Sequence, residues 1–203
     1  MTSFSLPGVP HDFRPLLSSG GRAEQDGDAV TLHAGAGDDL FRRPGTDRAV
    51  ATAKVFGFAV DGDFRLEAEV QVEFLSDFDS AVLVGYLDER HWFKLCAERD
   101  ELGSPRIMSV VTRERSDDAT GIHLDGGPVR LRISRSGTMV SLHYCTDGAR
   151  WNLARYFDFP VTGSEGALRA GIAVQSPRGT GTSATFRDVR FSADGVTEVR
   201  SGE

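Results

Sequence analysis

The stretch from Phe64 to Phe74, FRLEAEVQVEF, constrains the fold more than any other part of the sequence. Apolar residues occupy every second position, and charged or amide residues fill the positions between them. Because alternate side chains of a β-strand point to opposite faces, a period of two predicts a strand with one buried and one solvated face. The same alternation returns in VRLRIS, residues 129–134, and in VSLHYC, residues 140–145.

Further strand patterns run along the chain, separated by short turns rich in Gly and Asp. Gly137 lies between two of them, and Asp147-Gly148 has the composition of a hairpin turn. No amphipathic helix of ten or more residues is evident. We therefore predict an all-β fold, an antiparallel jelly-roll β-sandwich. The expected strands are 29–34, 49–58, 64–74, 80–88, 91–99, 106–113, 129–134, 138–145, 151–157, 168–175 and 182–192.

Two neighbouring segments differ from the rest. Residues 80–88, SAVLVGYLD, are apolar almost throughout, which is typical of a strand that is covered on both faces. In residues 91–99 one face carries Phe93, Leu95 and Ala97, and the other carries Trp92, Lys94, Cys96 and Glu98. We expect a central strand whose Trp/Lys/Glu face lines a concave groove.

Length and charge narrow the classes of protein. The chain has 203 residues, a net charge of −7 and a pI of about 5.3. A single β-sandwich of this length can bury a large core, so we expect one domain over residues 1–203, with poorly structured ends at about 1–28 and 194–203. The arginines are spread singly, and this acidic chain has no basic footprint for nucleic acid or for a membrane surface.

The sequence shows no targeting signal and no metal-binding motif. The N-terminal residues lack the apolar core of a signal peptide, and no run approaches the ~20 apolar residues of a membrane span, so we expect a cytoplasmic protein. Cys96 and Cys145 are the only cysteines, and buried free thiols are favoured over a disulfide in that reducing compartment. No Cys/His ligand spacing is present, and we expect no metal and no cofactor.

An ordered series of residues resembles a known family. The series comprises Asp79, Ala81-Val82-Leu83, Asp88, Trp92, Lys94, Glu98, SVVT at 109–112, Ser116-Asp117, Arg130, Arg132, Asp147-Gly148, Trp151 and GIAVQSP at 171–177. Over about residues 39–192 this resembles a bacterial and fungal family of unknown function related to the regulation-of-enolase protein. The resemblance implies a concanavalin A-like fold, in a superfamily that includes lectins and glucanases, and it implies no particular activity.

The chain departs from the family pattern at two places. The family usually has Ser-Asp-Trp where this chain has Ser116-Asp117-Asp118, and Gln-Ala-Gly-Leu where it has Ser80-Ala81-Val82-Leu83. If the missing tryptophan normally packs over a ligand, this chain binds a different ligand or binds it weakly. We interpret Ser109 to Thr112 as a strand end and Arg113 to Asp118 as its exit loop, which would form an acidic rim.

Three candidate ligand-binding residues lie on the polar face of segment 91–99. Glu98 either accepts hydrogen bonds from ligand hydroxyls or acts as a general acid with a raised pKa; alternatively, it forms an ion pair. Lys94 either pairs with Glu98 or holds an anionic ligand. Trp92 offers a flat apolar platform to a sugar, and it is equally compatible with an ordinary core residue.

Asp79, Thr112 and Gln175 complete the predicted ligand-binding set. Asp79 precedes a buried strand, where a carboxylate that caps backbone N–H groups is favoured over one that faces a cleft. Thr112 ends a strand near the groove rim, where a solvated edge is the alternative. Gln175 either hydrogen-bonds a ligand or satisfies a loop backbone.

The motifs of the common hydrolases and nucleotide-binding proteins are absent. A glycosidase needs two carboxylates that flank the bond, and the spacing of the related glucanases, Glu-x-Asp-x-x-Glu, does not occur. No nucleophile elbow or phosphate loop is present. The leading hypothesis is a non-catalytic binding or regulatory module for a carbohydrate or another small polar metabolite. The alternatives are an enzyme that uses Glu98 as acid/base, and a protein-interaction scaffold that forms a homodimer.

Overall fold

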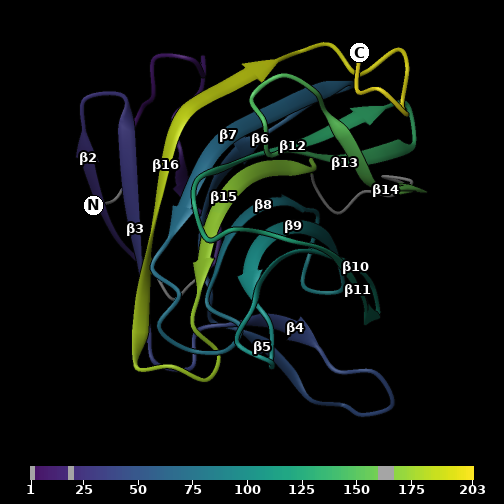
Figure 1. Cartoon of the computed structure of the whole chain (residues 1–203). Helices are drawn as coiled ribbons and strands as arrows, with labels where there is room; N and C mark the ends of the chain where they lie inside the picture. Colours follow the sequence, from purple (N-terminus) through teal and green to yellow (C-terminus); the bar gives the residue numbers. More distant parts are fainter. Residues whose placement is uncertain (1–2, 18–20, 160–166) are drawn as a thin grey trace.

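The computed structural model describes residues 3–17, 21–159 and 167–203. Within them the chain forms two seven-stranded sheets and a two-stranded hairpin, and every strand pair is antiparallel. Figure 1 shows them as three layers, with the hairpin against the side of one sheet that faces away from the other. The prediction of an antiparallel jelly-roll β-sandwich is confirmed. No helix that could cross a membrane occurs in the described residues.

Sheet I holds the strands that carry the candidate site. In spatial order these are β1 (Arg14–Pro15), β6 (Lys54–Ala59), β15 (Arg169–Gln175), β8 (Ser80–Tyr86), β9 (His91–Arg99), β10 (Pro105–Arg113) and β11 (Arg115–His123). β8 and β9 lie in the middle of the sheet, and all seven residues of β8 are buried, as its apolar composition predicts.

Sheet II packs across the inner face of sheet I. Its spatial order is β14 (Asn152–Asp158), β13 (Met139–Cys145), β12 (Val129–Ser136), β7 (Phe64–Val72), β16 (Gly181–Ser192), β3 (Ala29–Gly35) and β2 (Arg22–Asp26). β7 contains the alternating stretch, and its apolar residues are buried while the polar ones are half-buried. Apolar residues of both sheets form one core between them.

The hairpin consists of β4 (Leu40–Arg42) and β5 (Ala49–Ala51). It covers part of the outer face of sheet I, where Leu40 packs in a second apolar cluster with Trp92, Cys96 and other residues of that face. The strand predicted over 49–58 is therefore two strands, β5 and β6, which belong to different sheets. Sequence alternation alone did not reveal the break at Thr52–Ala53, where both backbone N–H groups donate to the carbonyl of Asp39.

The N-terminal segment corrects the expectation of a poorly structured end. Phe4, Leu6, Val9 and Phe13 are buried, and the rings of Phe4 and Phe13 stack with their centroids 5.1 Å apart. They close one edge of the core, which explains how a segment without periodicity becomes ordered. At the other end, Val196 is buried as well. Residues 1–2 and 18–20 of the predicted loose segment lie outside the described residues.

The charged stretch after Thr112 is a tight hairpin and not an exit loop. β10 continues to Arg113, β11 begins at Arg115, and Glu114 between them has a positive φ of 66°. β11 is an edge strand, and seven of its nine residues are exposed. Exposed charged side chains protect an edge strand from pairing with other chains. This explains why the composition of β11 is more polar than that of a typical strand.

Candidate functional site

The outer face of sheet I carries the polar residues singled out from the sequence. Phe93, Leu95 and Ala97 of β9 face sheet II, so Trp92, Lys94 and Glu98 face the hairpin side. The strand register places Glu98 opposite Ser80 on β8, and Ser80 opposite Gln175 on β15. Three strands that are distant in sequence thus bring Glu98 and Gln175 to one edge of the face.

Lys94 is buried, with 2% of its surface exposed, and bonds to neutral groups. Its Nζ donates to the carbonyl oxygen of Leu40 and to Oε1 of Gln175, each at 3.0 Å. It makes no ion pair with any residue in the described ranges, so of the two alternatives for Lys94 the ion pair with Glu98 is not observed. The ammonium has no carboxylate within ion-pair distance among the described residues, although it lies 5.7 Å from the ring centroid of Trp92 and acts on the pKa values of Asp39 and Glu98 from further away. Burying a cation without a direct ion pair costs free energy.

Glu98 is 7% exposed, and it too lacks a cation within ion-pair distance among the described residues. Burial raises the pKa of its carboxyl to about 7, against an ordinary 4.5; Lys94 lowers this pKa, while Asp39 and Asp118 raise it further. Ser80 also lowers it, although its buried Oγ has no hydrogen-bond partner of normal geometry. Perturbed buried carboxyls of this kind are concentrated at functional sites.

Asp39 is a member of the site that the sequence analysis missed. Its pKa is raised, mainly by burial, and Lys94 opposes that rise. Its Oδ1 accepts a hydrogen bond from the backbone N–H of Leu40 at 2.8 Å, and Nε2 of Gln175 lies 3.5 Å from the same oxygen. Asp39 directly precedes β4, 59 residues before Glu98, and no local sequence pattern indicated that the hairpin would place it on this face.

Asp79, Thr112 and Trp92 have roles in holding the fold. Asp79 is fully buried, and its carboxylate accepts hydrogen bonds from the N–H groups of Leu75 and Ser76 and from the hydroxyl of Ser176. This is the capping role that the sequence favoured.

The other two residues belong to the covered part of the face. The hydroxyl of Thr112 is 2.9 Å from that of Ser116, and both residues are buried. Trp92 is fully buried in the second apolar cluster, which corresponds to the core alternative, and its Nε1 has no hydrogen-bond partner. In this conformation neither residue can contact a ligand.

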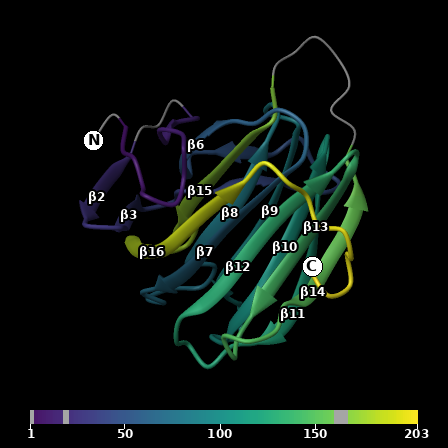
Figure 2. The ribbon, with the colours of Figure 1, turned by 90° about the horizontal axis from the view of Figure 1, so that it is seen from above.

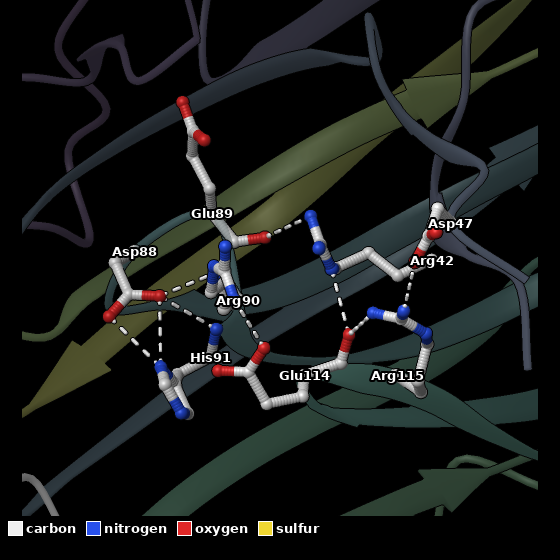
Figure 3. Close-up of polar contacts among 8 residues, drawn as sticks. All are labelled: Arg42, Asp47, Asp88, Glu89, Arg90, His91, Glu114 and Arg115. Carbon is white, nitrogen blue, oxygen red and sulfur yellow. Dashed lines mark hydrogen bonds and ion pairs between the residues drawn. The ribbon is translucent and has the colours of Figure 1, made fainter.

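A network of exposed polar contacts fastens the hairpin over the face (Figure 3). Arg42 of β4 donates through Nε to the carbonyl oxygen of Glu114 at 2.9 Å, and Arg115 donates to Asp47 at 2.7 Å. Arg90 forms a further ion pair with Glu114 at 2.6 Å. The ion pairs are exposed to solvent, so each is expected to contribute only ~1 kcal/mol or less. The hairpin is held over Trp92 and Lys94 mainly by the buried Leu40 and its bond from Lys94, and the exposed ion pairs add little.

No cation-binding cluster accompanies these residues. Within residues 3–17, 21–159 and 167–203, no three His, Cys, Asp or Glu side chains converge as metal ligands would. Cys96, on the same face, is a buried free thiol whose pKa is raised by burial. Cys145, on sheet II, is also a buried free thiol, as predicted.

Comparison with solved structures defines the class of this protein as a concanavalin A-like β-sandwich. A legume lectin-like domain from Entamoeba histolytica superimposes with a TM-score of 0.55 at 10% identity, over 85% of this chain and 87% of that domain. The GH43 protein BlXynB from Bacillus licheniformis gives a TM-score of 0.70 at 18% identity, and there 90% of this chain matches 36% of the longer one. At these identities the likeness shows the fold alone.

The chain belongs to the family described as protein of unknown function DUF1349, which matches residues 19–194. Regulation of enolase protein 1 of Saccharomyces cerevisiae is 26% identical over 172 residues, which cover 83% of this chain and 84% of the yeast protein. A crystal structure of a functionally unknown S. cerevisiae protein has a TM-score of 0.77 at 23% identity, over 87% of this chain and 94% of that one. The family resemblance seen in the sequence is confirmed.

Proposed function

We propose that this protein is a non-catalytic binding module that recognises a carbohydrate or another small polar metabolite at the outer face of sheet I, beside Glu98. One observation carries the proposal: Lys94 and Glu98 lie buried on the same face without an ion pair to each other or to any other described residue. A buried ammonium such as that of Lys94 is normally paired, and leaving it unpaired costs stability, while the carboxyl of Glu98 keeps its proton up to about pH 7 and needs a hydrogen-bond partner instead. A ligand that supplies hydrogen bonds would offset that cost.

The chemistry of the face suits a polyhydroxylated ligand. Glu98 and Asp39 offer carboxyl oxygens that accept hydrogen bonds from hydroxyls, and Gln175 offers both a donor and an acceptor. Asp118 of β11 is exposed, and the register places it in the cross-strand row of Lys94, so it lies at the open rim. The lectin-like domain and the GH43 protein share this fold, and they support a carbohydrate as the ligand by analogy only.

A glycan array together with a thermal-shift screen of polyols and sugar acids tests this proposal. We expect a small set of hits, and we expect Glu98→Gln to abolish them or weaken them at least tenfold, because the substitution replaces a strong acceptor with an amide of the same shape. Trp92→Ala is unsuitable as a test, since it would open a cavity in a fully buried cluster. A matched control is Glu101→Gln on the exposed turn before β10. The absence of any hit in both screens would contradict the proposal.

One observation favours a second function, an enzyme that uses Glu98 as acid/base. A carboxyl with a pKa of about 7 holds its proton near neutral pH and can donate it to a leaving group. Asp39, whose pKa is also raised, is the second carboxyl of the site. If the protein turns over any hit from the screens, Glu98→Gln should remove that turnover and leave the fold intact. Full activity in that variant would exclude Glu98 from the chemistry.

A further inference from the structure

A cavity of about 550 Å³ lies on the opposite side of the sandwich, over the outer face of sheet II. Its lining includes a tryptophan, a glutamate and four arginines: Trp151, Glu67, Arg65, Arg130, Arg132 and Arg190. These arginines come from β7, β12 and β16, which are neighbours in the sheet although they are far apart in sequence. The chain as a whole carries a net charge of −7, so a cluster of four arginines at one place on its surface is unusual for this protein.

The register of the three strands explains how the cavity forms. Arg65 on β7 lies between Ser134 of β12 and Ser192 of β16, both of which are short. In the next row, Glu67 lies between Arg132 and Arg190. Ser192 and Arg65 line the cavity in the first row, where Ser134 is buried beside Ser141, and Glu67, Arg132 and Arg190 line it in the second.

Carboxylates neutralise only part of this charge. Arg132 pairs with Glu67 at 2.9 Å, while Arg130 and Arg190 share Asp188 at 2.6 and 2.7 Å. The side chain of Arg65 forms no ion pair or hydrogen bond with any residue of the described chain, and the residue is half-buried. Glu67 and Asp188 make the direct ion pairs, and Glu69 and Glu203 act on Arg130 and Arg132 from further away. Arg65, whose side chain has no ion pair, is one of the residues that line the cavity.

The remaining walls of the cavity are held by contacts with the C-terminal segment and with Trp151. The guanidinium of Arg132 lies over the ring of Trp151, 3.9 Å from its centroid, and donates to the carbonyl of Gly202. The C-terminal segment, yellow in Figure 2, crosses β12 and β13, where His143 Nε2 is 2.7 Å from the carbonyl oxygen of Val199. Arg132 is thus fixed, while Arg65 and Arg190 stay accessible.

We propose that this cavity binds a small organic anion, whose carboxylate or phosphate group is held by Arg65 and Arg190. The planar guanidinium presents paired N–H donors that match both kinds of oxyanion. The volume is in the range of small-molecule sites, and an anion here would supply the counter-charge that Arg65 lacks. Arg132 also has a lowered pKa, to which burial contributes most and nearby Arg65 contributes further. A bound anion would relieve this repulsion.

Isothermal titration calorimetry at low ionic strength tests this site with four probes: glucose 6-phosphate, glucuronate, inorganic phosphate and neutral glucose. We expect at least one of the three anions to bind and glucose not to bind at this site. The phosphate and carboxylate probes together identify which oxyanion is preferred. Arg65→Gln should weaken binding by about tenfold to a hundredfold, since it removes a charge-assisted contact. Arg65→Lys, which keeps the charge and loses the paired donors, should fall in between.

Arg187→Gln is the matched control, because Arg187 is an exposed arginine of β16, the strand of Arg190, and does not line the cavity. Arg187→Gln should leave the affinity for the anion unchanged. Glu98→Gln on the opposite sheet should also leave it unchanged, and this result would distinguish the cavity from the ligand site of the proposed function. If Arg65→Gln does not fold, Arg190→Gln replaces it, since the Arg190 side chain is 65% exposed. The proposal is overturned if none of the anions binds, or if the arginine variants bind as tightly as the parent.

Discussion

The substitution Glu98→Gln should make the protein more stable at alkaline pH and leave its stability almost unchanged near pH 4. In the folded chain the pKa of Glu98 is raised to about 7, and the unfolded chain has the ordinary value of 4.5. Below pH 4.5 the carboxyl is protonated in both states, so the shift has no effect there. Between pH 4.5 and about 7 only the folded state holds the proton, and the free energy of unfolding falls as the pH rises.

The size of this effect follows from the shift. One pKa unit corresponds to about 1.4 kcal/mol, so the full shift corresponds to about 3 kcal/mol once the pH exceeds 7. Glutamine has the same shape and no charge to desolvate. Glu98→Gln should therefore exceed the parent in stability by up to about 3 kcal/mol at pH 8. For a chain of this length that corresponds to a rise in Tm of about 6 to 12 °C.

Urea unfolding of both proteins at pH 5, 6, 7 and 8 measures the effect directly. The difference in free energy of unfolding between variant and parent should grow with pH and level off above pH 7. Glu101→Gln, on an exposed turn, accounts for the loss of one negative charge. A difference that does not change with pH, or a variant less stable than the parent at pH 8, would show that Glu98 is not a desolvated carboxyl.

Three further predictions concern the frame of the site. Asp79→Ala should lower the free energy of unfolding by about 2 to 4 kcal/mol in urea titrations, because it removes three hydrogen bonds of 2.7 to 3.0 Å; a loss below 1 kcal/mol would contradict the capping role. Gly85→Ala should cost about 1 to 3 kcal/mol, since its Cβ would lie 2.1 Å from a buried ring, whereas Gly127→Ala, with open space around it, should be nearly neutral in the same assay. Arg42→Ala should speed amide hydrogen exchange in residues 39–53 without changing exchange in β8 and β9. Arg43→Ala is the control and should not speed exchange in residues 39–53. Equal exchange in both variants would show that the network does not fasten the hairpin.

The fold was largely predictable because the strands are long and alternate clearly. The period of two in residues 64–74 places β7 with its apolar side in the core, and the apolar run of β8 predicts a central strand; both agree with the structure. β11 and β2 were missed because edge strands are exposed and carry no apolar face to reveal them. Phe4 and Phe13 were missed because two rings in a loop segment give no periodic signal.

The candidate site was predictable only in part. Alternation along β9 placed Trp92, Lys94 and Glu98 on one face, which the structure shows. The hairpin that covers this face depends on contacts between residues more than 70 positions apart, such as Arg42 with Glu114. The arginine cavity was missed for the same reason: Arg65, Arg130 and Arg190 look isolated in sequence, and only the strand register gathers them.

A nuclear magnetic resonance titration with the strongest-binding glycan or polyol tests the central claim, that the outer face of sheet I binds a polar ligand beside Glu98. The account predicts chemical-shift changes of backbone amides around Ser80 and Glu98, which are paired across β8 and β9, and around Asp118 on β11, in the cross-strand row of Lys94. These shifts should disappear in Glu98→Gln. Shifts confined to the arginine cavity on sheet II, or shifts beside Glu98 that persist in Glu98→Gln, would contradict it.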